Sequence, residues 1–62
     1  MVIFEIDFTT LDEQEITRTI TSEDYYFAGL SDIEQWALAA TIGIDMADRE
    51  NMTMWTIRLI AN

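Results

Sequence analysis

The chain has 62 residues, of which twelve are acidic and three are arginine, and it contains no lysine, histidine, cysteine or proline, so its formal net charge is −9. A chain this short buries only about 60% of the surface that its unfolded form exposes, so residues 1–62 form at most one small acidic domain. The missing thiol and imidazole groups remove the commonest nucleophile, general base and zinc ligands, and the acidic excess opposes direct contact with nucleic acid or an anionic membrane. We therefore expect no enzyme, no metal and no cofactor, but a protein partner with a basic surface.

The N-terminal residues and the apolar runs bear on localisation. The first residues carry no positive side chain and reach an acid at Glu5, which is unlike a signal peptide. No apolar run approaches the ~18 residues of a membrane span, since the longest covers residues 36–44. Both features predict a protein without a signal peptide or transmembrane segment, for which the cytoplasm is the default location.

Two segments near the N-terminus alternate between apolar and polar residues, which is the pattern of half-buried strands. The first covers residues 2–9 and the second residues 16–21. The polar segment 10–14 between them contains no glycine, which predicts a hairpin with a longer loop of right-handed residues rather than a tight two-residue turn. Arg18 lies between two apolar residues of the second strand, which suits an edge strand whose charge can reach water.

The strongest helix signal begins at Ser31. Ser31 and Glu34 have the spacing of a capping box, so a helix is expected to begin at Asp32. Apolar residues then recur at helical spacing, and we expect this stripe to pack deep against the sheet. The stripe consists of Ile33, Trp36, Ala37, Ala40 and Ile44, widened by Leu38 and Ile42.

The sequence is compatible with two ends for this helix. It could stop near Ile42 with Gly43 as its C-cap, or continue to Glu50 with Asn51 in the left-handed conformation. A glycine inside a helix costs roughly 1 kcal/mol relative to alanine, and acids near the C-terminal end oppose the helix dipole. The apolar spacing nevertheless continues beyond the glycine, which favours the longer helix.

A third alternating segment, residues 53–60, completes the fold. Trp55, Ile57 and Leu59 are expected to face the core, and Met54 and Thr56 the opposite side. Because a right-handed crossover can skip one position, the third strand pairs most simply with the first. We therefore predict an α+β fold: a small ββαβ domain with a three-stranded antiparallel sheet of order 2-1-3, packed on one face by a single helix. The predicted core comprises Val2, Phe4, Ile6, Phe8, Ile16, Ile20, Ile33, Trp36, Ala37, Ala40, Ile44, Trp55, Ile57 and Leu59.

Carboxylates are the only abundant chemical groups, but their spacing does not match a metal site. Asp45 and Asp48 would share one face of the helix, yet the alternating ligands and central glycine of a calcium loop are absent. The serines have no histidine or lysine to activate them, and Ser31 already caps the helix. We expect no catalytic residue and no metal ligand. The hairpin acids Asp12 and Glu13 indicate a solvated turn.

An acidic and aromatic segment, residues 22–30, connects the second strand to the helix. Aromatic side chains supply binding energy at interfaces, and neighbouring acids favour a basic partner. Alternatively, the three consecutive rings close an open end of the core, although they cannot all point inward. Five acids have no evident local structural role: Glu23, Asp24, Asp45, Asp48 and Glu50. The candidate partner-binding residues are therefore Glu23, Asp24, Tyr25, Tyr26, Phe27, Asp45, Asp48 and Glu50.

Charge and aromatic content together predict a small acidic protein-binding module. In size and acidity the chain is similar to the small phage-encoded inhibitors of host polymerases, nucleases or defence systems, some of which mimic DNA. This resemblance is one of class and involves no shared motif; it implies binding to a basic or nucleic-acid-binding surface of a host protein. The alternative is a structural or assembly subunit that acts as a homo-oligomer, because area burial and conformational entropy nearly cancel in so small a core.

Overall fold

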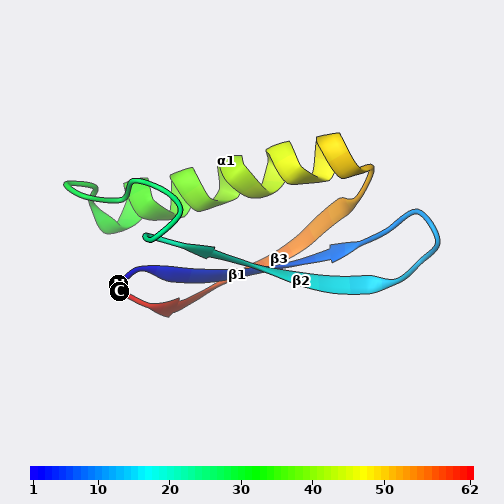
Figure 1. Ribbon diagram of the computed structural model, residues 1–62, viewed down its shortest axis with the longest axis horizontal. Coiled ribbons are helices and arrows are strands. Elements are labelled where there is room, and N and C mark those ends of the chain that lie inside the picture. The colour runs from blue at the N-terminus through cyan, green and yellow to red at the C-terminus, as the bar shows by residue number, and fades with distance from the viewer.

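Three strands and one helix make up most of the chain, and the computed structural model describes all 62 residues. In chain order the elements are β1 (Ile3–Thr9), β2 (Glu15–Thr21), α1 (Asp32–Glu50) and β3 (Thr53–Ala61). Figure 1 shows α1 lying along one face of the sheet, while the other face is uncovered. The molecule is elongated, measuring 38 by 19 by 18 Å, and both chain termini lie at the end where α1 begins (Figure 1).

The sheet has the order β2-β1-β3, and β1 pairs antiparallel with both neighbours. The predicted α+β fold and its strand order are therefore confirmed. In the register, Phe4 lies opposite Ile20 of β2 and opposite Leu59 of β3. The strict apolar alternation of β1 suits this central position, because every second side chain points into the space between sheet and helix.

β3 departs from strict alternation where its pairing with β1 shifts register. Phe8 pairs with Met54 and Asp7 pairs with Thr56, so Trp55 is the extra residue of a β-bulge. The prediction that Trp55 faces the core and Met54 faces away is therefore wrong: Trp55 is 54% exposed, whereas Met54 packs against the core. Beyond this bulge the strand returns to the predicted alternation.

The hairpin loop has the predicted length but a different conformation. The amide of Thr10 donates to the carbonyl of Gln14 at 2.8 Å and closes the loop. Glu13 has a φ of 65°, so the expectation that the loop uses only right-handed residues is wrong. Here a glutamate occupies the left-handed position. A search of the sequence for glycines at turns therefore could not have identified it.

α1 begins and ends where the longer helix was predicted to do so. The amide of Glu34 donates to Ser31 Oγ at 3.3 Å, and the amide of Ser31 donates to Glu34 Oε1 at 2.9 Å, which completes the capping box. At the other end Asn51 adopts the left-handed conformation with a φ of 54°, and its amide donates to the carbonyl of Ala47. The helix thus passes through Gly43 without a break.

The face that α1 turns toward the sheet differs from the predicted one. Ile33 is 81% exposed and Ile44 is 53% exposed, Ala37 is also exposed, and Trp36 is only partly covered. Placing these four residues in the core was wrong. The helix residues that are buried or half-buried against the sheet are instead Leu38, Ala39, Ile42, Gly43, Met46 and Ala47.

Close approach explains this rotation of the helix. A Cβ added at Gly43 would lie 2.7 Å from the Sδ atom of Met54 and 2.8 Å from the Cδ1 atom of Ile6. The helix therefore approaches the sheet closely at Gly43. Ile33 and Ile44 of the predicted stripe remain outside, whereas Leu38 and Ile42 are half-buried against the core. The spacing of apolar residues cannot show which face of α1 meets the sheet. Both faces are apolar, and Gly43 does not count as an apolar residue in this spacing.

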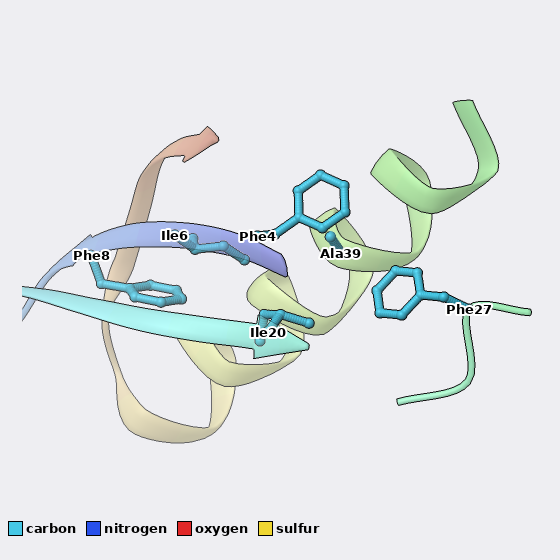
Figure 2. Close-up of a cluster of buried hydrophobic side chains, with 6 residues drawn as sticks. All are labelled: Phe4, Ile6, Phe8, Ile20, Phe27 and Ala39. Carbon is cyan, nitrogen blue, oxygen red and sulfur yellow. The ribbon is translucent and has the colours of Figure 1, made fainter. Parts of the chain in front are cut away.

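The buried core lies between the sheet and α1. Trp36 covers one edge of it, with its ring packed edge-on against Phe4 at a centroid distance of 5.0 Å. Burying one large apolar side chain stabilises the fold by roughly 1.5–3 kcal/mol relative to leaving it exposed, so a few such residues account for most of the stability of a small domain. Figure 2 shows the six buried side chains of the core, which come from β1, β2, the helix and the connecting loop: Phe4, Ile6, Phe8, Ile20, Phe27 and Ala39.

Candidate protein-binding surface

Residues 22–30, which we call the aromatic loop, connect β2 to α1 and are tied to the start of β1. The amide of Ser22 donates to the carbonyl of Val2, and the amide of Val2 donates to Ser22 Oγ, both at 3.0 Å. The amides of Asp24 and Tyr25 both donate to the carbonyl of Thr21 at 3.1 Å, which bends the chain as soon as the strand ends. These bonds fix the first half of the loop against the sheet.

The three consecutive aromatic residues divide between core and solvent. Phe27 is buried and stacks on Phe4 with a centroid distance of 6.1 Å. Tyr25 is half-buried and packs against the core. Tyr26 points away and is 82% exposed. Both predicted roles of this segment are therefore represented: Phe27 closes the end of the core, while Tyr26 leaves an aromatic ring free for contact.

The aromatic loop borders an open hollow of about 500 Å³. Its far wall is held in place by Gln35 of α1, whose Nε2 atom donates to the carbonyl of Leu30 at 3.2 Å. Gly29 turns the loop with a φ of 79°, a left-handed value that favours glycine. The volume lies in the range of pockets that hold small ligands or single side chains. Its apolar lining comes mainly from Val2, Tyr25, Tyr26, Phe27, Ala28 and Leu30.

Acids without a basic neighbour surround this end of the molecule. Glu23 and Asp24 are exposed on the aromatic loop, and Asp32 and Glu34 are exposed on the first turn of α1. None of these four carboxylates contacts an arginine. The backbone amide of Ser31 holds the pKa of Glu34 below its usual range, so this carboxylate stays ionised. The end that carries Tyr26 is therefore negatively charged.

At the opposite end, two of the three predicted acids have basic partners. Glu50 receives two hydrogen bonds from the guanidinium of Arg18, at 2.6 and 3.0 Å, and these lower the pKa of Glu50 and raise that of Arg18. Asp45 pairs with Arg49 one turn along the helix, at 2.6 Å. The expectation that Glu50 and Asp45 have no local structural role is therefore wrong. Asp48 is exposed and contacts no arginine.

The third arginine contacts two acids on the uncovered face of the sheet. Arg58 of β3 donates to both carboxylate oxygens of Asp7 and, at 3.3 Å, to Glu5. The hydroxyls of Thr17 and Thr56 donate to Asp7 at 2.6 and 2.7 Å. The Arg58 hydrogen bonds, followed by those of the two threonines, hold the pKa of Asp7 well below its usual range, and Asp7 raises the pKa of Arg58.

Sequence reasoning missed this cross-strand network, although a usable signal was present. The alternation of β1 and β3 places Glu5, Asp7 and Arg58 on the same face of the sheet, and β1 pairs with β3 in the predicted order. Opposite charges on directly facing strands commonly pair, so strand order and alternation together could have predicted the contact. The register, in which Glu5 lies opposite Arg58, follows from the β-bulges and was not available.

The structure thus divides the predicted partner-binding residues into two separate groups. The aromatic loop brings together Glu23, Asp24, Tyr25, Tyr26 and Phe27 at the start of α1, whereas Asp45, Asp48 and Glu50 lie near its end (Figure 1). Asp48 follows Asp32 by sixteen positions, which corresponds to about 24 Å along the helix axis. A single small contact cannot include both groups, so the aromatic loop is the stronger candidate.

Neither the chemistry of these side chains nor comparison with known proteins supplies a further assignment. No three histidine, cysteine, aspartate or glutamate side chains lie close enough together to hold a metal ion. No helix combines the length and apolar character that crossing a membrane requires. The chain matches no family model, no curated protein and no solved structure.

Proposed function

We propose that this protein is a small acidic binding module that occupies a basic surface of another protein through the aromatic loop. The observation that carries the proposal is the environment of Tyr26, an aromatic side chain that is 82% exposed beside acids that contact no cation. Exposed tyrosines are enriched among the residues that dominate binding energy at protein interfaces. The neighbouring carboxylates select a partner that is rich in arginine or lysine.

The local geometry fits an arginine or lysine of the partner. A guanidinium over the face of the Tyr26 ring would gain a cation–π contact, and Glu23 and Asp24 precede this tyrosine by three and two residues in the same loop. The hollow beside the ring offers an apolar wall for the aliphatic part of the same side chain or of its neighbour. This combination favours a basic, partly apolar protein surface over a purely electrostatic contact.

The charge distribution extends the proposal to surfaces that bind nucleic acid. A net charge of −9 on a body 38 Å long raises the rate at which a strongly basic partner is met. Protein surfaces that bind DNA or RNA are the commonest strongly basic surfaces, because they must neutralise phosphates. Occupation of such a surface would inhibit nucleic-acid binding, which is the action expected of a phage-type inhibitor or DNA mimic.

Co-purification from a bacterial lysate tests this proposal, with a matched pair of variants. Tyr26→Ala removes the exposed ring of the aromatic loop, and Leu11→Ala removes a side chain of equal exposure, 82%, at the tip of the hairpin. We expect the wild-type protein and Leu11→Ala to retain the same nucleic-acid-handling protein at low salt and to release it at high salt. Tyr26→Ala should retain at least about tenfold less, the loss typical of an interface residue worth more than 1.4 kcal/mol.

Two results would contradict the proposal. Failure to retain any nucleic-acid-handling protein at low salt would remove the proposed class of partner. Equal retention by Tyr26→Ala and Leu11→Ala would show that binding does not use the aromatic loop. Circular dichroism of each variant establishes that both are folded, which is expected because both side chains are exposed.

A homo-oligomeric assembly subunit is the second candidate, and one observation favours it. On the uncovered face of the sheet the acids are partly compensated, since Arg58 contacts both Glu5 and Asp7. Trp55 and Ile60 are exposed on β3, an edge strand nine residues long. Two copies could therefore approach through this face and edge with less repulsion than through the ends that carry unpaired acids. Size-exclusion chromatography with light scattering tests this, and a strict monomer at high concentration would reject it.

A further inference from the structure

The apolar stripe that the sequence places in the core lies on the outside of α1. Ile33, Ala37, Ala40 and Ile44 alternate at spacings of four and three residues, and we call them the outer stripe. Spacing of this kind forms the seam between packed helices, because it keeps one apolar line facing a partner. The sheet covers a different face of α1: Ile33 and Ile44 at the two ends of the stripe are strongly exposed, Ala37 is exposed and Ala40 is half-buried.

The shape of the outer stripe suits a second helix. Its two ends carry isoleucines, while Ala37 and Ala40 in the middle have small side chains that permit close approach of another helix backbone. Trp36 closes the side of the stripe that is next to the sheet, because its ring is anchored edge-on against Phe4. The outer stripe is therefore a shallow apolar surface that Trp36 bounds on one side.

The other margin of the stripe is acidic. Glu34 directly follows Ile33, and Asp48 lies one helical turn beyond Ile44. Both are exposed and contact no arginine. They are fourteen residues apart, or about 21 Å along the helix axis. Thr41 occupies the position midway between them, so no cation lies on this margin. In helix pairs the residues beside the apolar seam determine which partner is accepted.

We propose that the outer stripe binds an amphipathic helix of a partner protein whose apolar face is bordered by arginine or lysine. Such a helix would cover the stripe and place its cations against Glu34 and Asp48. A second copy of this chain fits poorly, because antiparallel helices would set Glu34 of one copy near Asp48 of the other, and parallel helices would set each acid beside its equivalent. The outer stripe is distinct from the aromatic loop, although Glu34 lies near both, and the inference does not depend on the function proposed for the loop.

Nuclear magnetic resonance titration with two synthetic peptides tests the proposal on the intact protein. Both peptides are amphipathic helices of about three heptads with leucine at the a and d positions, and they carry either arginine and lysine or glutamine beside the seam. We expect the basic peptide to shift the amide signals of Ile33, Ala37 and Ile44. It should bind at least about tenfold more tightly than the glutamine peptide at low salt, and this advantage should shrink as salt is added.

Matched variants locate the contact. The double substitution Ile33→Ser with Ile44→Ser should abolish binding of the basic peptide, whereas Leu11→Ser, which removes an equally exposed apolar side chain from the hairpin, should leave it unchanged. Asp48→Asn should weaken binding about two- to fivefold, the effect of losing one exposed ion pair, and Glu15→Gln should not weaken it. Tyr26→Ala should bind the peptide normally, which separates this surface from the aromatic loop.

Three outcomes would overturn the inference. The first is that the basic peptide does not bind up to millimolar concentration, or binds no better than the glutamine peptide. The second is that the shifted amides lie in the aromatic loop or the hairpin and not along α1. The third is that the signals of Ile33 and Ile44 change with protein concentration alone, which would identify a second copy as the occupant.

Discussion

The two apolar faces of α1 have similar sequences and different surroundings. The inner face carries Ala39 and Gly43, both buried, and the outer face carries Ile33 and Ile44, both exposed. The inner face also carries Leu38, Ile42 and Met46, so hydrophobicity alone does not distinguish the two faces. What distinguishes the inner face is Gly43, which allows the helix backbone to approach Ile6 and Met54 closely.

This difference shows that the burial of a helix face depends on fit as well as on apolar area. Close packing gains many small dispersion contacts, and these are lost when a large side chain holds two elements apart. The exposed face then keeps a large apolar surface, and in a chain of 62 residues this surface is a considerable cost unless something covers it. The comparison therefore yields predictions both for stability and for binding.

The largest effect is expected from Phe4, which supports the inner side of the helix. Phe4→Ala removes a completely buried ring that contacts both Phe27 and Trp36, and it should lower the free energy of unfolding by about 3–5 kcal/mol. In so small a domain this loss is enough to unfold much of the population. Ile33→Ala on the outer face should change stability by no more than about 0.5 kcal/mol. Urea denaturation followed by circular dichroism measures both, and similar losses for the two variants would refute the assignment of faces.

The next largest effect on stability is expected from Gly43, where the helix approaches the sheet most closely. Gly43→Leu places a large side chain where even a Cβ atom would meet Met54 and Ile6, so it should destabilise the fold by about 1–3 kcal/mol. Ala37→Leu makes a comparable enlargement on the exposed face and should be nearly neutral, because leucine is a good helix former. If Gly43→Leu proves as stable as the wild-type protein, close packing at this glycine does not determine the orientation of α1.

Much of the architecture follows from local patterns in the sequence. The alternation of β1, the capping box at Ser31 and the left-handed position of Asn51 each depend on a few neighbouring residues, and all three are found as predicted. The sheet order follows from the order of the elements and the geometry of the crossover. These features could be predicted because their causes are local or topological.

The errors have a common cause in contacts between distant segments. The orientation of α1 depends on the fit of Gly43 against β1 and β3, and the exposure of Trp55 depends on a bulge opposite β1. The pairing of Glu50 with Arg18 joins residues thirty-two positions apart. For the candidate surface, the segment could be predicted from composition, but the sequence could not show that Tyr26 is the exposed ring and Phe27 the buried one.

Acidic residues on the two faces of α1 extend the comparison to pH. Glu50→Gln removes the partner of Arg18, and Asp48→Asn removes an outer acid that contacts no arginine. Because the folded-state pKa of Glu50 is lowered, its contribution is fully present above the ordinary glutamate pKa of about 4.3 and is lost as the pH falls through the lowered value. The wild-type protein should therefore be more stable than Glu50→Gln at neutral pH, and the two unfolding curves should converge on acidification.

The matched variant makes this pH experiment specific. Asp48→Asn removes one negative charge from the same end of the helix without removing an ion pair, so it should be as stable as the wild-type protein at neutral pH or slightly more stable. A gap between wild type and Glu50→Gln that persists unchanged at low pH would mean that the glutamate acts through packing and not through its charge.

The smallest expected effect is that of salt, and it tests whether the unpaired acids outweigh the paired ones. Four of the twelve acids contact an arginine, which leaves eight without a cation. At about 10 mM salt the Debye length is about 30 Å, which is close to the 38 Å length of the molecule, so acids at both ends repel one another. At about 150 mM salt the Debye length is about 8 Å, and this repulsion is screened. The melting temperature should therefore rise over this range, and Asp48→Asn should flatten the rise. A melting temperature that falls with salt would mean that the ion pairs of Arg18 and Arg58 contribute more than the repulsion between the unpaired acids.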